Sequence, residues 1–498
     1  MKYLNKNLTC ALFCSLTTGL TNFAAAEEKI WFSEGIERVP YDDSVFKPDP
    51  DSSKLPYNVK EALDVYRNKF TTDEPRPMLE LGYDIYETGP FPESSFIFGK
   101  KNPVTQQFLI YGDWQTTLSQ VDDVNQGPSF TQLATRLNLD IDWKLTATER
   151  FHMLVRPLDD NGKITRAIKI DGVDETDTQS EFNIEPDAFF FEGDLGAITS
   201  GFSDSYTSWD LPFAVGLMPI LFQNGVWLED AFTGLAFTIP AGNSSEWDIS
   251  NYDITFFAGF DKVSSAISNA DETNANLYGV TAFLDATQGY WEMGYGFTQD
   301  TSSLGDQSYH NISAAFTKRY GAWLSNSLRL IANVGQERKN NAPTTADGFL
   351  FLIENSLITS KPSTLVPYFN FFVGIDRPQS LARAAGAGGV LKNTGITFES
   401  PGLGAIPTLD STANDTIGGA IGVEYLFSLN QQLVVELGTV IDSDSASNSS
   451  NVDKNQFGLG IRYQKPFNNR WIVRVDGNTI VEDDATRSGI SLEVKRKF

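Results

Sequence analysis

The chain has 498 residues, and its 64 acidic side chains outnumber 38 basic ones, which gives a formal net charge of −26. This excess of negative charge argues against a nucleic-acid partner, which would require a basic surface. The chain has only 2 cysteines, Cys10 and Cys14, so a disulfide-stabilised scaffold is excluded as well.

The first 26 residues have the pattern of a removable export signal. Lys2 and Lys6 precede an apolar stretch over residues 8–20, and the small residue Ala26 closes a run of alanines suited to cleavage. The apolar stretch is too short to span a bilayer. We expect cleavage after Ala26, which would remove both cysteines and leave an exported chain without thiols.

Residues 27–105 differ from the rest of the chain in their high proline content. An amphipathic helix is expected over residues 59–70 and a short element over 79–86. We interpret this region either as a periplasmic segment or as a plug that folds into the interior of the following domain.

From residue 106 to residue 498 the hydrophobic pattern has a period of two. Leu137, Leu139 and Ile141, for example, alternate with Arg136 and Asp140. About 18 such segments follow one another, and their connections alternate between short and long. The sequence predicts an all-β fold, a transmembrane antiparallel β-barrel of about 18 strands, with lipid outside and water inside. An exported barrel of this kind belongs in the Gram-negative outer membrane.

The last predicted strand places Ile490, Leu492, Val494 and Phe498 on one face. It resembles the C-terminal sorting strand of outer-membrane proteins, which implies the barrel-assembly machinery as a partner. Arg496 departs from that pattern, because an aromatic residue is usual at its position.

Charged residues occupy the face predicted to line the lumen. The basic candidates for solute selectivity are Arg136, Arg150, Arg156, Arg329, Arg462, Arg470, Arg474 and Lys495. The acidic residues on the same face are Asp140, Asp142, Asp253, Asp261, Asp476, Glu424, Glu436 and Glu493. Either the arginines favour anions, or they pair with carboxylates across strands and stiffen the wall.

Two long connections stand out. Residues 202–230 are unusually apolar for an outer loop, so they fold inward as a constriction, pack under other loops or contain a pair of strands. We favour the inward-folded constriction. The candidates in this segment are Trp209, Phe213, Phe222, Trp227, Glu229 and Asp230. Residues 377–416 are rich in alanine and glycine and are expected to form a flexible outer loop.

The sequence shows no catalytic, metal or cofactor site. After signal cleavage the chain keeps both of its histidines, His152 and His310, and no Gly-x-Ser-x-Gly element is present. Ser308 lies near His310 in sequence, but a catalytic triad is recognised by geometry and not by adjacency. No segment matches an EF-hand loop. We therefore predict a protein without catalysis, cofactor or metal.

The chain resembles outer-membrane porins, and among them the alginate-exporter type. The resemblance rests on residues 134–140 (ATRLNLD) leading to 146–150 (TATER), on 189–191 (FFF) before Gly193 and Gly196, and on 223–225 (QNG) before 230–232 (DAF). It implies passage of an anionic polysaccharide through an arginine-lined lumen. The acidic charge and the proline-rich N-terminal region depart from this pattern.

These observations predict a channel for passive passage of solutes across the outer membrane. Its surroundings would be outer-membrane lipid and lipopolysaccharide, and its cargo small solutes. Two alternatives remain: an exporter of an anionic polysaccharide, and a structural or adhesive barrel whose acidic loops meet a surface partner.

Overall fold

The computed structural model describes residues 76–82, 97–99, 106–124, 127–160, 163–164, 167–170, 178–179, 182–267, 274–302, 307–337, 344–398, 402–427, 430–443, 455–483 and 485–498. The expected signal segment, the helix over residues 59–70 and most of the proline-rich region lie outside these residues. The unit described below begins at Pro75.

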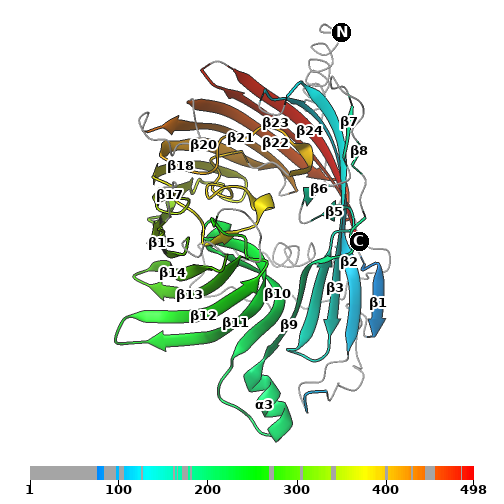
Figure 1. Cartoon of the computed structure of the whole chain (residues 1–498), viewed down its shortest axis with the longest axis vertical. Helices are drawn as coiled ribbons and strands as arrows, with labels where there is room; N and C mark the ends of the chain where they lie inside the picture. The colour runs from blue at the N-terminus through cyan, green and yellow to red at the C-terminus, as the bar shows by residue number, and fades with distance from the viewer. Residues whose placement is uncertain are drawn as a thin grey trace, which may run out of the picture. The chain divides into compact units, whose positions relative to one another are not determined.

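Within the described residues, eighteen antiparallel strands close into a barrel (Figure 1), which confirms the predicted fold. They are β2 (Gln107–Asp122), β3 (Phe130–Lys144), β4 (Arg150–Val155), β9 (Pro186–Asp194), β10 (Pro212–Phe222), β11 (Leu228–Ser244), β12 (Ile249–Asp261), β13 (Ala275–Ala286), β14 (Gly289–Asp300), β15 (Tyr309–Tyr320), β16 (Leu324–Val334), β17 (Phe349–Leu357), β18 (Leu365–Ile375), β20 (Thr416–Phe427), β21 (Gln431–Asp442), β22 (Gln456–Pro466), β23 (Trp471–Val481) and β24 (Thr486–Lys497).

The ring closes between its first and last strands. Asp113 of β2 lies opposite Lys497 of β24, and the pairing continues to Asp122 opposite Ser488. Beyond the end of β24, the backbones of Gly112 and Phe498 exchange two hydrogen bonds of 2.9 and 3.0 Å. Closure leaves no long unpaired edge, as a backbone in lipid requires.

The shorter elements lie at the barrel's ends or inside it. They are β1 (Leu79–Gly82), β5 (Asp159–Asp160), β6 (Lys163–Ile164), β7 (Ala167–Ile170), β8 (Thr178–Gln179), α3 (Leu195–Ser203), η2 (Gln223–Gly225), β19 (Ala382–Arg383), η4 (Ala385–Ala387) and η5 (Gly402–Gly404). β1 pairs with β2 just beyond the point where β24 ends. No helix among the described residues is long and apolar enough to cross a membrane.

The outer face of the wall is apolar, as the period of two predicts. Trp114, Leu437 and Ile421 each expose half or more of their side chain there. The guanidinium of Arg496 lies over the ring of Trp471, 5.5 Å from its centroid. The residue that departs from the expected sorting pattern is therefore held against an aromatic side chain of the neighbouring strand, through a cation–π contact.

The prediction that residues 202–230 form a single constriction loop is wrong. The structure forms β10 over Pro212–Phe222 and begins β11 at Leu228. Before β10, Asp194 caps helix α3 by accepting a hydrogen bond of 2.6 Å from the backbone N–H of Ala197. The two strands meet in a tight turn around η2, at the end of the barrel opposite Phe498.

The predicted flexible loop over residues 377–416 is also corrected. We call residues 376–398 and 402–415 the lumenal insert, because they run inside the ring of strands as the yellow trace of Figure 1 shows. Leu381, Leu391, Ile396 and Leu403 of the insert are fully buried. A segment that buries this much apolar surface is packed as part of the core.

Candidate functional site

The inner face of the wall is identified by the side chains that meet the lumenal insert. Phe398 of the insert lies against Gly458 and Gly460 of β22, and Ile406 lies against Gly489 of β24. Side chains at alternate positions from these glycines face the interior, because successive residues of a strand point to opposite faces. This places most of the predicted lumenal charges on the inner wall.

A continuous band of inner-face charges runs across seven neighbouring strands of the described wall, from β22 through β23, β24, β2, β3 and β4 to β9. We call it the charged belt, and its residues are Arg462, Asp476, Arg474, Glu493, Lys495, Asp113, Arg136, Asp142, Arg150 and Glu192. Since the strands are adjacent and hydrogen-bonded, neighbouring charges of opposite sign come within contact distance.

The belt is paired through most of its length on β22 to β2. Arg462 Nε donates to Asp476 Oδ1 at 2.6 Å. Arg474 lies 3.8 Å from Glu493 Oε1, and Lys495 lies 3.6 Å from Asp113 Oδ2. These three contacts support the interpretation that basic and acidic residues pair across strands.

Pairing continues on β3, β4 and β9. Arg136 Nε donates to Asp159 Oδ2 at 2.7 Å, which draws the β5–β6 hairpin toward the wall. Arg150 pairs with Glu192 and lies 3.9 Å from Asp142. Arg150 keeps 45% of its side chain exposed, so it is the belt cation most accessible to a solute.

Three of the basic candidates lie elsewhere. Arg156 follows β4 and donates two hydrogen bonds to the Asp187 carboxylate, in a bidentate contact at 3.0 and 2.9 Å. Arg329 is buried and pairs with Glu354 at 3.0 Å. Arg470 is exposed in the turn before β23, so its predicted place on the lumen wall is wrong.

The insert covers the opposite wall, whose inner face carries both apolar and polar buried side chains. Trp227, in the turn between β10 and β11, is fully buried against Gly294 of β14. Its indole N–H donates to Asn311 Oδ1 at 2.8 Å, and its backbone carbonyl accepts from the N–H of Leu381 at 2.7 Å. The turn and the insert are therefore one packed unit.

Other contacts tie the same turn to the insert. Ser380 Oγ donates to the carbonyl of Val226 at 2.7 Å. Arg383 lies 3.1 Å from Glu229 Oε2, and β19 pairs in parallel with the start of β11. The structure thus joins two connections that are far apart in sequence, which sequence reasoning treated separately.

The constriction candidates divide between the two ends of β10. Trp209 precedes the strand, and Phe213 is its second residue and packs on Phe191 with ring centroids 5.8 Å apart. The other four candidates lie at the opposite end, next to the insert: Phe222, Trp227, Glu229 and Asp230. Because these four residues lie beside the insert, we still predict that they contribute to the constriction.

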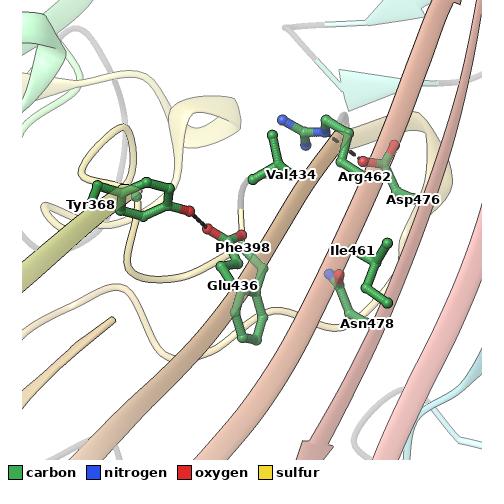
Figure 2. A pocket seen from close by; sticks show the side chains of 9 residues that line it. Tyr368, Phe398, Val434, Glu436, Ile461, Arg462, Asp476 and Asn478 are labelled. Carbon is green, nitrogen blue, oxygen red and sulfur yellow. Dashed lines mark hydrogen bonds and ion pairs between the residues drawn. The ribbon is translucent and has the colours of Figure 1, made fainter. Parts of the chain in front are cut away.

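A half-open cavity of about 150 Å³ lies between the insert and the wall (Figure 2). Phe398 of the insert and Tyr368 of β18 border it, together with Glu436 of β21 and the Arg462–Asp476 pair. Sequence reasoning placed Glu436, Arg462 and Asp476 on the lumen wall but missed Tyr368 and Phe398. Only the inward course of the insert brings the two rings together with the charges.

The two histidines lie on separate strands: His152 of β4 is 3.3 Å from Glu192 Oε1, and His310 belongs to β15. His310 lies on the outward face and shares a hydrogen bond of 2.9 Å with Tyr295 Oη. Ser308 Oγ accepts from the backbone N–H of Asp300. Among the described residues, no group of three or more metal-ligating side chains is close enough to hold a metal ion.

Solved structures of outer-membrane channels are similar to this fold. OpdK from Pseudomonas aeruginosa matches with a TM-score of 0.50 and 11% identity, over 78% of this chain and 98% of OpdK. OccK5 (OpdH) from the same organism gives 0.49 and 10%, over 81% and 99%. OccK2 (OpdF) in complex with glucuronate gives 0.48 and 10%, over 78% and 98%.

No protein-family model matches the chain, and no curated protein is significantly similar to it. At 11% identity, the likeness to OpdK shows a shared β-barrel fold and does not identify a solute.

Proposed function

We propose that the chain is an outer-membrane channel for passive passage of small hydrophilic solutes. The observation that carries this proposal is the closed ring of eighteen strands in the described residues, apolar outside and crossed inside by the charged belt. A barrel of this strand number encloses more space than its own wall side chains fill. The lumenal insert occupies part of that space, which favours a selective channel over an open pore.

The position in the membrane follows from the same proposal. The end that carries Phe498 and the shorter connections would face the periplasm, and the end with the longer connections would face outward. Lipid would meet the apolar outer face, and lipopolysaccharide the outward loops. β24 would be the segment that the barrel-assembly machinery recognises.

Export of an anionic, alginate-like polysaccharide is the second candidate. The exposed guanidinium of Arg150 favours it, because planar guanidinium groups suit carboxylates. Against it, every basic residue of the charged belt has a carboxylate partner. The net field of a paired wall is weak, and net field decides ion selectivity.

A proteoliposome swelling assay tests the proposal. Vesicles that contain the purified full chain should swell in isotonic solutions of small sugars and amino acids, and should remain stable in an oligosaccharide solution. Swelling equal to that of protein-free vesicles in every solute would contradict a channel and would favour a structural barrel. Uptake of charged oligouronates in preference to small solutes would favour the exporter.

A further inference from the structure

The cavity between the insert and the wall, called here the insert pocket, has polar and apolar sides. Its volume of about 150 Å³ gives room for about five water molecules at roughly 30 Å³ each. Phe398 and Val434 supply apolar surface, and Glu436, Arg462 and Asp476 supply charge (Figure 2). A small organic molecule would meet both kinds of surface at once, as ligand sites generally provide.

One polar atom at this pocket lacks a hydrogen-bond partner. Asp476 Oδ1 accepts from Arg462 Nε, but Asp476 Oδ2 is buried and no donor in the described structure reaches it. The terminal amino groups of Arg462 likewise donate to no described residue. Buried polar atoms are nearly always paired. The pocket therefore offers the terminal amino groups of Arg462 as donors, beside a carboxylate that Arg462 already holds.

The far side of the pocket holds a second polar pair. Tyr368 Oη donates to Glu436 Oε2 at 2.5 Å. The ring of Phe398 lies close to Glu436, with Gly458 and Gly460 beneath it. A molecule in the pocket would thus have hydrogen-bonding groups at two ends and a flat apolar surface beside it.

The charges of the pocket select against charged molecules. Glu436 and Asp476 repel an anion, and an ammonium group would compete with Arg462 for Asp476. A hydroxyl group does neither, because it accepts from the terminal amino groups of Arg462 while the ion pair with Asp476 stays intact. We propose, on the basis of the channel function above, that the insert pocket binds a neutral polyhydroxylated solute of monosaccharide size.

The test is a calorimetric titration of the full chain in detergent with three matched probes. D-glucose, D-glucuronate and D-glucosamine share one ring and differ in charge. Glucose should bind, and glucuronate should bind about tenfold more weakly because like charges repel at close range. Equal or tighter binding of glucuronate or glucosamine would overturn the proposal, as would absence of glucose binding.

Three variants test whether glucose binds in the pocket. Val434→Phe fills the cavity and should abolish glucose binding, whereas Val473→Phe on the lipid-facing side of β23 should leave it unchanged. Glu436→Gln keeps the shape and removes one negative charge, so it should reduce the preference for glucose over glucuronate. Glucose binding that survives Val434→Phe in a folded barrel would place the site elsewhere and overturn the proposal.

Conductance of the same preparation separates the two proposals. A chain that conducts ions in a planar bilayer but binds no glucose would reject the pocket's ligand and leave the channel function standing. A chain that binds glucose but neither conducts ions nor permits swelling would reject the channel function.

Discussion

The inner wall of the barrel has two regions, and their side chains are partnered in different ways. From β22 round to β9 it is polar, and its charges neutralise one another in pairs such as Arg462–Asp476. From β10 to β17 a packed connection covers it, and fully buried apolar residues such as Trp227 and Leu381 lie among buried polar ones such as Asn311. The comparison shows that an inner wall can face water or face protein, and that its residues differ accordingly.

Glycines mark the places where the insert meets the wall. Gly294 lies beneath Trp227, Gly296 beneath Leu381, and Gly458 beneath Phe398. A side chain at any of these positions would occupy space that the larger residue fills. The insert is therefore fitted to this wall and stabilised by apolar burial, whereas the charged belt depends on ion pairs that are partly exposed and individually weak.

The largest expected effect comes from removing the central side chain of the covered region. Trp227→Ala creates a cavity and leaves Asn311 without its indole donor, so the free energy of unfolding should fall by about 3–5 kcal/mol. The loosened insert should also raise the single-channel conductance. Thermal unfolding followed by gel mobility, with bilayer recording, measures both effects.

Trp247→Ala is the matched control, since Trp247 is exposed in the turn between β11 and β12. It should change neither quantity. An unaltered conductance and stability in the Trp227 variant would show that the insert does not depend on this contact.

A smaller effect should follow from filling one glycine contact. Gly458→Ala places a methyl group 2.3 Å from Phe398 Cε2, so the insert must shift, at a cost of about 1–3 kcal/mol. In Gly477→Ala the nearest atom would be 3.9 Å away, and little should change. The unfolding midpoints of the Gly458→Ala and Gly477→Ala variants test this prediction. Equal midpoints would show that Phe398 does not need the space above Gly458.

The charged belt should respond in selectivity more than in stability. Arg150→Gln removes the most exposed belt cation and leaves Asp142 and Glu192 with less neutralisation, so permeability should shift toward cations. The reversal potential under a salt gradient reports that shift. Arg470→Gln, in the exposed turn, changes the net charge equally and should leave the reversal potential unchanged. Equal shifts in both variants would mean that the belt does not control selectivity.

The smallest effect concerns Asp410 of the insert. Burial raises the pKa of Asp410, although hydrogen bonds from Thr412 oppose this. The folded state therefore favours the protonated form: the stabilisation is complete below the ordinary pKa of about 3.9 and is lost as pH rises through the raised value. Asp410→Asn should weaken this fall in stability above about pH 4. Identical pH profiles of the unfolding midpoint would exclude Asp410 as the cause.

How well the strands could be predicted from sequence also depends on whether their inner face meets water or protein. Strands with a lipid face and a watery face, such as β3 with Leu137 and Arg136, show a period of two and could be identified from sequence. β10 could not, because its inner residues Met218 and Ile220 are covered and its two faces are both apolar. The polarity that marks a strand disappears where protein replaces water.

The site was only partly predictable for a related reason. Alternation placed Arg462 and Asp476 on the inner face correctly, and their pairing was one of two interpretations left open. The path of the insert was not visible, because alanine and glycine at residues 384–389 suggest flexibility when their packing partners are unknown. Gly458 and Gly460 make room for Phe398, a role that alternation alone does not reveal.

The most direct test of the account is single-channel recording of the purified full chain in a planar bilayer under a salt gradient. We expect discrete openings with a weak preference for cations, because paired charges cancel and carboxylates slightly outnumber basic residues in the described belt and its partners. A strong anion preference would contradict the paired belt. A silent bilayer, from a preparation shown to be folded, would contradict the channel itself.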